Sequence, residues 1–502
     1  YRWMQPQQIR TPGATKTLSY DALQRPTLIE IRSGQNPNKL LAQRRYAYDE
    51  AGNIVQIQSE LGQTGYGYDP LNRLSKAEPG QALQTLGLPQ EAYSYDAAGN
   101  RLSSAHQAGA WAYNADNQMT QYPATTPFER NPGVETQVSY TAQGHTQKES
   151  NVLESKEYEY NAAERLIRYA STEQGQSGPQ IEASYRHDPF GRRIAKTVKQ
   201  GSQTKTTYYI YSEQGLMAEA DEKGQMTKAY GFNPVAAQLG LWSTDPIWQA
   251  ETSNGSLTDP KARYDWLHTD HLGTPILATT KEGQTSWKAI AESFGSTQII
   301  EQDIEVNLRF PGQYFDAETG THYNFHRDYR PNAGRYLQSD PIGLEGGMHF
   351  YQFAPNIQTW VGPPGLTGTY FFKSGTNCYI GKGKRNRMLK SMRDRIDGQI
   401  NATQCSHMDF GNHDTGFIVE HLVLQAVQDD IKRKTNKYGC TRLLNQIGSP
   451  GAAKFDLLDA KKKRAAKRLA KKVTSGFLNT TLPAAVGKCK NRCKTVKVKN
   501  TL

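Results

Sequence analysis

Five side chains between residues 370 and 445 are of the types that hydrolyse phosphodiester bonds. They comprise two tyrosines, an arginine, a glutamate and an asparagine: Tyr370, Tyr379, Arg387, Glu420 and Asn445. Phosphodiester hydrolysis needs a nucleophilic water, neutralised charge at the phosphate and a stabilised leaving group. A set that combines phenol, guanidinium and carboxylate groups can meet these needs, so it is the first candidate site.

Short strands and helices must bring these residues together. Residues 368–381 are predicted to form a hairpin, because two β-favouring runs flank a turn at 373–377. The hairpin places both tyrosines on neighbouring strands, where they can serve one site. Helices are predicted over 384–396 and 416–434, and the second holds Glu420 in an apolar neighbourhood, where a carboxylate must find a cation.

The order of these residues resembles the GIY-YIG nucleases, through Gly368-Thr369-Tyr370 and the run YIGKGK at 379–384. The resemblance implies a role for each member: Tyr370 acts as or assists the general base, Tyr379 positions phosphate or water, Arg387 stabilises developing charge, Glu420 holds one divalent metal ion, and Asn445 orients the site. The ion would be Mg²⁺ or Mn²⁺, because Mg²⁺ favours carboxylate and water ligands. Basic residues beside the second strand would contact nucleic-acid phosphates: Lys382, Lys384 and Arg385. Thr369 departs from the family, which usually has an aliphatic residue there, and the spacing of the tyrosines is slightly short.

Charge divides the chain at Thr367. From there on, 28 lysines and arginines face 9 aspartates and glutamates, a net charge of +19, while residues 1–366 carry −7. A strongly basic module binds polyanions, and nucleic acid is the leading candidate. The basic run 461–472 is predicted to be a helix that contacts phosphate backbones without reading sequence. A solvated helix, or a docking surface for an acidic partner, is the alternative.

All five cysteines lie in the basic module, and we expect free thiols. Cys489 and Cys493 are close in sequence, but no second pair at zinc-ligand spacing accompanies them, so a zinc site is not favoured. We expect no signal peptide and no membrane segment, since no apolar run approaches the roughly 20 residues of a membrane helix. The chain begins within a pattern, as a fragment of a longer protein would.

The first 200 residues repeat a loose motif: Tyr-Asp, small residues that often include Gly-Asn, and then Arg-Leu or Arg-Ile. Copies stand at 20–25, 48–53, 68–74 and 95–102, and degenerate copies stand at 158–166 and 185–194. Each copy places turn chemistry between two alternating runs, which predicts strand, turn and strand. A spacing of about 20 to 28 residues is typical of repeat architectures, so one long sheet of stacked hairpins is expected.

These copies resemble YD repeats, also called RHS repeats, over roughly residues 15–366. The resemblance implies a mainly β fold, a YD-repeat β-shell whose sheet spirals into a hollow cocoon. A small α/β GIY-YIG-like domain and a basic helical tail would follow. We expect the repeat shell at 1–300, an RHS-associated core at 301–366, the nuclease domain at 367–455 and the tail at 456–502. A generic β-solenoid that binds sugars is the alternative.

Three segments resemble the RHS-associated core that closes the shell ahead of a variable toxin: 266–275, 309–316 and 334–344. The first contains His268 and His271, which could suggest a metal site. No acidic or cysteine cluster lies near them in the sequence, so packing or hydrogen bonding is expected instead.

In the RHS family the core is an aspartyl autoprotease that uses two Asp-Pro-x-Gly-Leu motifs and cuts after the second leucine. The first motif begins at Asp340 and is intact, but in the second motif Gly362 occupies the aspartate position. Two carboxylates are needed because one must be charged while the other stays protonated. Asp340 alone is expected to be nearly inactive, so the bond Leu366–Thr367 should stay intact.

Together these resemblances imply a secreted bacterial RHS toxin, delivered into the cytoplasm of a competitor, whose shell encloses a metal-dependent DNase. A cognate immunity protein is an expected partner. Secretion-apparatus or chaperone partners would act through an N-terminal part that precedes this sequence. One alternative makes RNA the substrate of the same site, and a second makes the chain an inert carrier whose basic cargo only binds nucleic acid.

Overall fold

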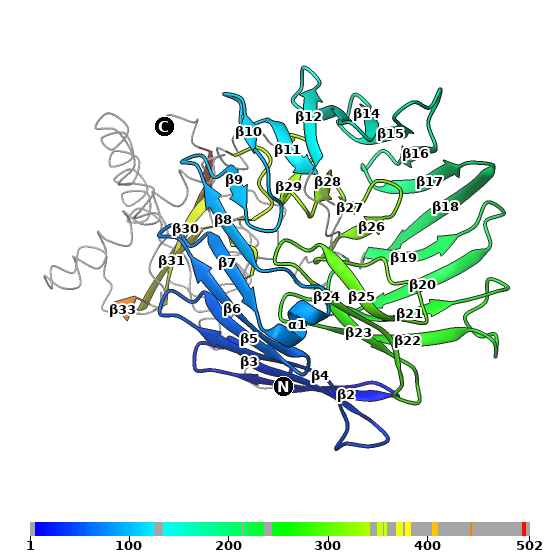
Figure 1. Cartoon of the computed structure of the whole chain (residues 1–502). Helices are drawn as coiled ribbons and strands as arrows, with labels where there is room; N and C mark the ends of the chain where they lie inside the picture. Colours follow the sequence, from blue (N-terminus) through cyan, green and yellow to red (C-terminus); the bar gives the residue numbers. More distant parts are fainter. Residues whose placement is uncertain are drawn as a thin grey trace, which may run out of the picture. The chain divides into compact units, whose positions relative to one another are not determined.

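The computed structural model describes residues 6–124, 134–212, 215–234, 243–341, 349–354 and 356–358, and five strands beyond residue 367. The chain divides into two compact units: residues 1–341 with 351–362, and residues 342–350 with 363–502. In the described part of the first unit, the regular secondary structure is β-strand apart from one short helix, as predicted (Figure 1). Its single short helix among the described residues is α1 (Gln81–Thr85).

Two large sheets make up most of the first unit, and in both the strands follow one another in chain order. The 9-stranded sheet contains β1 (Gln8–Arg10), β2 (Ala14–Tyr20), β3 (Pro26–Ser33), β4 (Leu40–Tyr48), β5 (Ile54–Ser59), β6 (Gly62–Tyr68), β7 (Leu74–Pro79), β8 (Glu91–Tyr95) and β9 (Arg101–Ser104). The 16-stranded sheet contains β10 (Ala112–Tyr113), β11 (Met119–Ala124), β12 (Val134–Tyr140), β13 (Thr146–Ser150), β14 (Glu154–Tyr160), β15 (Leu166–Glu173), β16 (Ile181–His187), β17 (Arg193–Gln200), β18 (Gln203–Ser212), β19 (Gly215–Ala220), β20 (Met226–Phe232), β21 (Pro246–Glu251), β22 (Arg263–Thr269), β23 (Pro275–Thr279), β24 (Thr285–Ala291) and β25 (Thr297–Gln302). This order is what consecutive hairpins produce.

The Tyr-Asp motif forms the turn that joins the two strands of each repeat. In the turn between β6 and β7, the Asp69 carboxylate accepts hydrogen bonds from the backbone N–H of Leu71 (2.9 Å), the backbone N–H of Arg73 (2.9 Å) and the Arg73 Nε (2.6 Å). Asn72 takes the left-handed conformation with φ 59°, which asparagine and glycine tolerate best. The turns 21–25 and 188–192 repeat the Asp–Arg pair. Turn chemistry therefore accounts for the second half of the motif.

The tyrosine of the motif ties one repeat to the repeat before it. The Tyr68 hydroxyl donates a hydrogen bond to the backbone carbonyl of Ile54 at 2.7 Å, and Ile54 begins the second strand of the preceding repeat. The same type of bond recurs along both sheets: Tyr20 to Pro6, Tyr48 to Pro26, Tyr95 to Leu74, Tyr113 to Arg101, Tyr140 to Met119, Tyr160 to Thr146 and Tyr211 to Arg193. Turn arginines also stack on the next tyrosine, as Arg73 does 4.8 Å from the centre of the Tyr95 ring.

Replacing Tyr68 by phenylalanine should lower the free energy of unfolding by about 1 kcal/mol, because the ring stays and one hydrogen bond is lost. Tyr208→Phe is the matched control, since the Tyr208 hydroxyl meets the exposed Arg186 side chain at 3.4 Å. Urea unfolding followed by circular dichroism measures both variants. Equal effects of the two substitutions would show that the tyrosine–carbonyl bonds do not stabilise the repeats.

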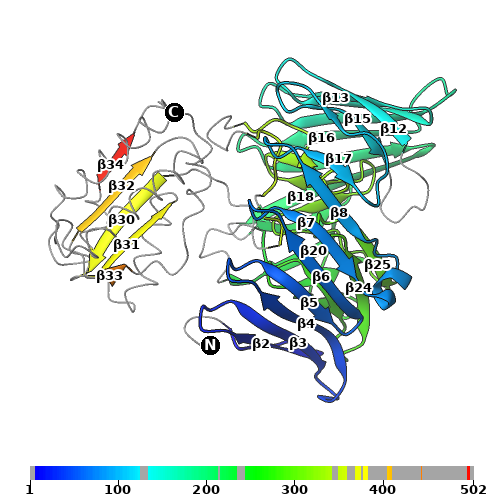
Figure 2. The ribbon, with the colours of Figure 1, turned by 60° about the vertical axis from the view of Figure 1, so that its left-hand side comes forward.

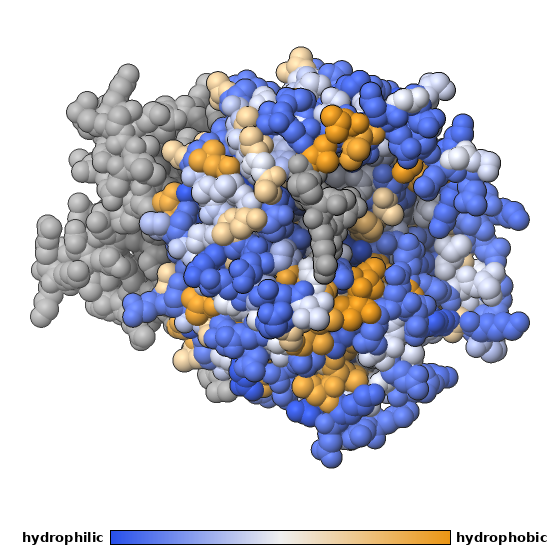
Figure 3. Space-filling model, in the orientation of Figure 1, coloured by the Kyte–Doolittle hydropathy of each residue, from blue (hydrophilic) through white to orange (hydrophobic). Residues whose placement is uncertain are grey.

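The 9-stranded sheet packs against part of the 16-stranded sheet. A buried apolar cluster joins β2, β3 and β4 to β23: Ala14, Ile31, Leu41, Ala42, Ile276 and Leu277. Polar contacts support it, because Lys16 Nζ donates to the Thr269 carbonyl at 2.7 Å and Lys288 pairs with Glu60 at 2.8 Å. Figure 2 shows β2 to β8 side by side as one layer. The face in Figure 3 is mostly hydrophilic, with apolar residues in separate small patches.

The two histidines of the first core segment pack and form hydrogen bonds, as predicted. His268 Nε2 lies 2.9 Å from Thr279 Oγ1, and burial, helped by Lys16, lowers the pKa of His268 to about 3. His271 contacts the Tyr46 hydroxyl at 3.2 Å and the Gln358 carbonyl at 2.7 Å. Among the described residues, no group of three metal-ligating side chains comes together. Nor, in this described part, is any helix long and apolar enough to cross a membrane.

Candidate functional sites

The second unit contains a sheet that carries both candidate tyrosines. Its strands are β30 (Gly368–Ser374), β31 (Asn377–Lys382), β32 (Gln404–Asp409), β33 (Arg442–Leu443) and β34 (Lys494–Lys497), in the order β33-β31-β30-β32-β34. The predicted hairpin is present as the antiparallel pair β30 and β31, and its strands extend further into the turn than predicted. Tyr370 is opposite Gly381 and Tyr379 is opposite Phe372, so the register places both tyrosine positions on one face of the sheet. Lys382 ends β31.

The remaining members of the predicted nuclease set lie outside the described residues: Arg387, Glu420, Asn445, Lys384 and Arg385. The same holds for the helices predicted at 384–396, 416–434 and 461–472, and for the junction residues Gly362, Leu366 and Thr367. Of the predicted tail, the structure describes β34, which pairs with β32 of this sheet. The catalytic and metal-binding roles stay predictions. What the structure adds is the central position of β30 and β31 in the sheet that holds the two tyrosines.

Asp340, the aspartate of the intact cleavage motif, is held by an arginine. Its Oδ2 lies 2.9 Å from Nη2 of Arg327, and the two side chains are 14% and 15% exposed. The Arg327 guanidinium also lies 3.8 Å from the centre of the Tyr336 ring. The carboxylate therefore has a fixed position at the end of residues 305–340, which we call the core segment, and it is partly exposed to solvent.

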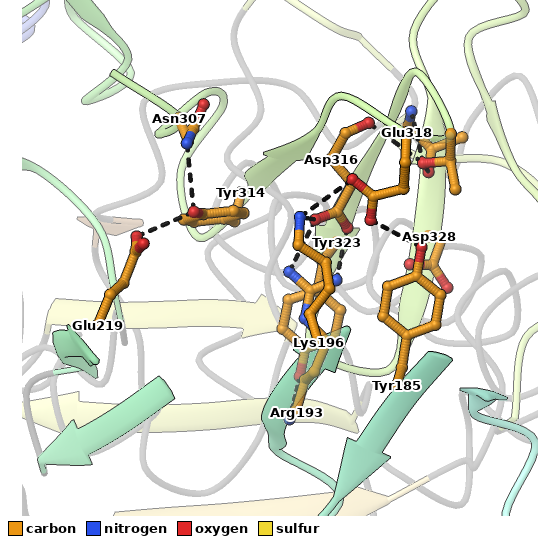
Figure 4. Close-up of polar contacts among 12 residues, drawn as sticks. Tyr185, Arg193, Lys196, Glu219, Asn307, Tyr314, Asp316, Glu318, Tyr323 and Asp328 are labelled. Atoms are coloured by element: carbon orange, nitrogen blue, oxygen red, sulfur yellow. Dashed lines mark hydrogen bonds and ion pairs between the residues drawn. The ribbon is translucent and has the colours of Figure 1, made fainter. Parts of the chain in front are cut away.

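A small sheet of the core segment is attached by buried charges to the two large sheets, which together we call the repeat wall (Figure 4). This sheet contains β26 (Tyr314–Asp316), β27 (Thr321–Asn324), β28 (Arg327–Arg330) and β29 (Arg335–Tyr336). Arg193 of β17 donates to Asp316 at 3.0 Å, and Lys196 Nζ contacts Asp316 at 2.8 Å and Glu318 at 3.1 Å. Burial alone would raise the pKa of Asp316, but Arg193 and Lys196 outweigh it and hold that pKa below its ordinary value.

Further contacts attach the core segment to other strands of the wall. The Tyr314 hydroxyl donates to Glu219 at 2.9 Å, and Glu149 pairs with Arg330. Hydrogen bonds to backbone carbonyls run in both directions. Arg101 of the wall donates to the carbonyl of Asn332 in the core segment at 2.9 Å, and Arg335 of the core segment donates to the carbonyl of Asn117 in the wall at 2.6 Å. Residues 305–340 are thus fixed at many points. Sequence reasoning missed these partners, because members of each pair lie far apart in the chain and carry no local motif.

Asp328 is a buried carboxyl, and in the described part of the chain no arginine or lysine forms a salt bridge with it. Burial, with the charge of Asp316, raises the pKa of Asp328 to about 6, although the hydrogen bond from Gln338 acts in the opposite direction. That bond joins Gln338 Nε2 to Asp328 Oδ2 at 2.6 Å, and the Asp328 N–H donates back to Gln338 Oε1 at 2.8 Å. The folded protein therefore holds a proton on Asp328 more tightly than the unfolded chain does.

Replacing Asp328 by asparagine should stabilise the protein at neutral pH, because the amide keeps a similar shape and needs no proton. The stability due to protonated Asp328 is complete below a pH of about 4 and is lost as pH rises through about 6. The variant should exceed the parent by roughly 3 kcal/mol above pH 7 and match it near pH 4. Urea midpoints at both pH values measure this, and a constant difference at all pH values would contradict it.

Two family models match the repeat region. The model described as the teneurin YD-shell matches residues 77–357, and the model described as the RHS repeat matches residues 48–79. The first match covers more than half of the chain. It agrees with the repeat identity and the mainly β fold predicted from the Tyr-Asp motif.

Curated relatives carry the names of toxins and nucleases. The double-stranded DNA deaminase toxin A of Burkholderia cenocepacia is 34% identical over 205 residues, which cover 38% of this chain and 14% of that protein. The probable deoxyribonuclease RhsA of Dickeya dadantii is 30% identical over 198 residues, which cover 39% of this chain and 13% of that protein. The chain therefore spans only a small part of these relatives.

A solved structure shares the fold of the first unit. The Photorhabdus luminescens Tc holotoxin pore superposes with a TM-score of 0.50 at 18% identity, over 70% of this chain and 18% of that chain. At this identity the similarity establishes the fold alone.

Proposed function

The chain belongs to the teneurin YD-shell family, and on that premise we propose that it is part of a bacterial toxin whose repeat shell encloses a C-terminal DNase. The proposal places the nuclease in residues 367–455 and the protective shell upstream of it. Delivery into the cytoplasm of a competing bacterium, and neutralisation by a cognate immunity protein, are parts of the same proposal.

The observation that carries the nuclease is the register of β30 and β31. It supports two tyrosine positions on one face of a sheet, next to the basic end of β31 at Lys382. The net charge of +19 from Thr367 onward supports a polyanionic substrate. The names of the Dickeya and Burkholderia relatives, a deoxyribonuclease and a double-stranded DNA deaminase, favour DNA.

The residue roles follow the GIY-YIG resemblance. Tyr370 would act as or assist the general base, Tyr379 would position phosphate or water, and Arg387 would stabilise negative charge as it develops. Glu420 would hold Mg²⁺ or Mn²⁺, a hard cation that suits a single carboxylate and water ligands. When bound, this ion would help to neutralise the phosphate.

A cleavage assay on the full chain, before and after brief proteolysis that opens the shell, tests the proposal. Supercoiled DNA and a structured RNA are offered in parallel, with Mg²⁺ or with EDTA. We expect Mg²⁺-dependent DNA cleavage that rises on opening. RNA cleavage alone would make the chain an RNase, and retention of both nucleic acids without cutting would make it a binding carrier.

The junction between shell and cargo gives a further prediction. Gly362→Asp should restore autoproteolysis and release a fragment that begins at Thr367 and ends at Leu502. The reason is that the RHS resemblance calls for a second carboxylate at this position, which would share a proton with Asp340. Mass spectrometry after refolding measures the product, and Gly362→Asn is the matched control that adds bulk without an acid. Efficient cleavage of the parent chain at this bond would contradict the two-aspartate account.

A further inference from the structure

Two repeats depart from the motif at neighbouring positions, and both departures face the core segment. In the turns 21–25, 69–73 and 188–192 an arginine bonds the aspartate of its own turn. In the turn 161–165 the aspartate position is Asn161, whose Oδ1 accepts two backbone N–H groups. Arg165 therefore has no aspartate in its own turn to pair with, and the charge of the adjacent Glu164 acts on it only as a weaker neighbour.

Arg165 instead reaches the tip of the β27–β28 hairpin. Its Nη1 donates to the backbone carbonyl of His326 at 2.8 Å, and its Nη2 meets Nδ1 of the same histidine. Nε of Arg165 is buried without a hydrogen-bond partner among the described residues. His326 and Phe325 form the two-residue loop of the hairpin, because Asn324 pairs with Arg327.

The second departure is His187, which stands where the motif has its tyrosine. The tyrosine at this position in other repeats donates to a carbonyl of the preceding repeat, which here would be that of Leu166. The imidazole cannot reproduce that bond in the same way, and its Nδ1 is buried without a partner among the described residues. The ring lies 6.5 Å from the ring of Tyr323, in β27 of the same hairpin.

We propose that Arg165, His187 and His326 form an acid-sensitive clamp that holds the β27–β28 hairpin on the repeat turns at neutral pH and loosens it in mild acid. A neutral imidazole accepts the Arg165 hydrogen bond at Nδ1, whereas an imidazolium ion has no acceptor and repels the guanidinium. The clamp is independent of the proposed nuclease activity. Since the next residue, Arg327, pairs with Asp340, loosening would also release that carboxylate.

Burial and nearby arginines disfavour protonation of both histidines while the clamp is closed, as the proposal requires. Burial, then Arg193 and Arg165, lower the pKa of His187 to about 4, against an opposing effect of Asp188. Burial, then Arg165 and Arg327, lower the pKa of His326 to about 4. Each folded value lies below the ordinary 6.5, so the stabilisation is complete above that pH and is lost as pH falls towards 4.

Two other groups of the hairpin titrate as well. Burial and Arg309 hold the pKa of His322 well below its ordinary value, which adds acid sensitivity of its own. Asp328, with its raised pKa, acts in the opposite direction. The clamp is therefore measured as a difference between variants that all retain His322 and Asp328.

Hydrogen exchange of the full chain at pH 7.5 and pH 5.0, corrected for intrinsic exchange rates, tests the clamp. The readout is the protection of amides in residues 321–330, with the buried strand β24 as internal reference. In the parent, protection of 321–330 relative to β24 should fall at pH 5.0. The double variant His187→Tyr with His326→Gln should reduce that fall by about tenfold or more, because each histidine carries more than one unit of pKa shift.

Controls separate the clamp from a general effect of acid. His271→Gln should keep the pH response of the parent, since His271 contacts Tyr46 and the Gln358 carbonyl. Arg165→Gln should lower protection at pH 7.5 and also reduce the fall between the two pH values. The clamp is overturned if the parent keeps full protection at pH 5.0, or if the double variant and Arg165→Gln both retain the fall seen in the parent.

Discussion

Replacing Glu420 by glutamine should abolish Mg²⁺-dependent cleavage of DNA by the shell-opened chain. The amide keeps the size of the side chain but removes the negative charge that the resemblance assigns to metal binding. Arg387→Ala or Tyr379→Phe should reduce the rate by about 10²-fold or more, as expected when one donor to the transition state is lost. Initial rates on supercoiled DNA, at saturating Mg²⁺, measure all three.

The matched control is Glu301→Gln, an exposed glutamate of β25 in the repeat unit. It makes the same chemical change and should leave the rate unaltered. The variants should also elute from a size-exclusion column and unfold in urea like the parent, which separates a loss of catalysis from a loss of folding. A Glu420→Gln chain that cuts DNA at the parental rate would show that the metal site is assigned to the wrong residue.

The repeat fold could be predicted from sequence because its causes are local. In the turn at Asp69, the acceptor, the donors at Leu71 and Arg73 and the left-handed Asn72 all lie within five residues. The same holds for the hairpin of β30 and β31. Its ends were less well predicted, because ladder hydrogen bonds extend the strands to Ser374 and from Asn377.

The attachment of the core segment could not be predicted in this way. Arg193 and Asp316 are separated by 123 residues, and neither has a pattern that identifies the other. The degenerate repeats at 158–166 and 185–194 were visible in the sequence, but the reason for their departures was not. That reason lies in the contact of Arg165 with His326, 161 residues further along the chain.

The Arg193–Asp316 pair should matter more to stability than any exposed ion pair of the repeats. Both side chains are 2% exposed, and Arg193 also lies 4.2 Å from the centre of the Tyr323 ring. Asp316→Ala would leave the guanidinium buried without its carboxylate, while Lys196 would retain Glu318. Loss of one partner of a buried pair costs about 3–5 kcal/mol, a large share of the roughly 5–15 kcal/mol that stabilises a typical domain.

Glu157→Ala is the control for Asp316→Ala, since Glu157 pairs with Lys148 at 3.1 Å on the surface and the two side chains are 52% and 47% exposed. That substitution should cost about 0–1 kcal/mol. Urea unfolding and trypsin resistance at pH 7.5 compare the two variants. Asp316→Asn should lie between them, because it keeps a hydrogen-bond acceptor for Arg193 but removes the charge. If Asp316→Ala and Glu157→Ala unfold at the same urea concentration, the buried charges do not hold the core segment to the repeat wall, and the apolar contacts of Tyr314 and Tyr323 with β18–β24 must do so instead.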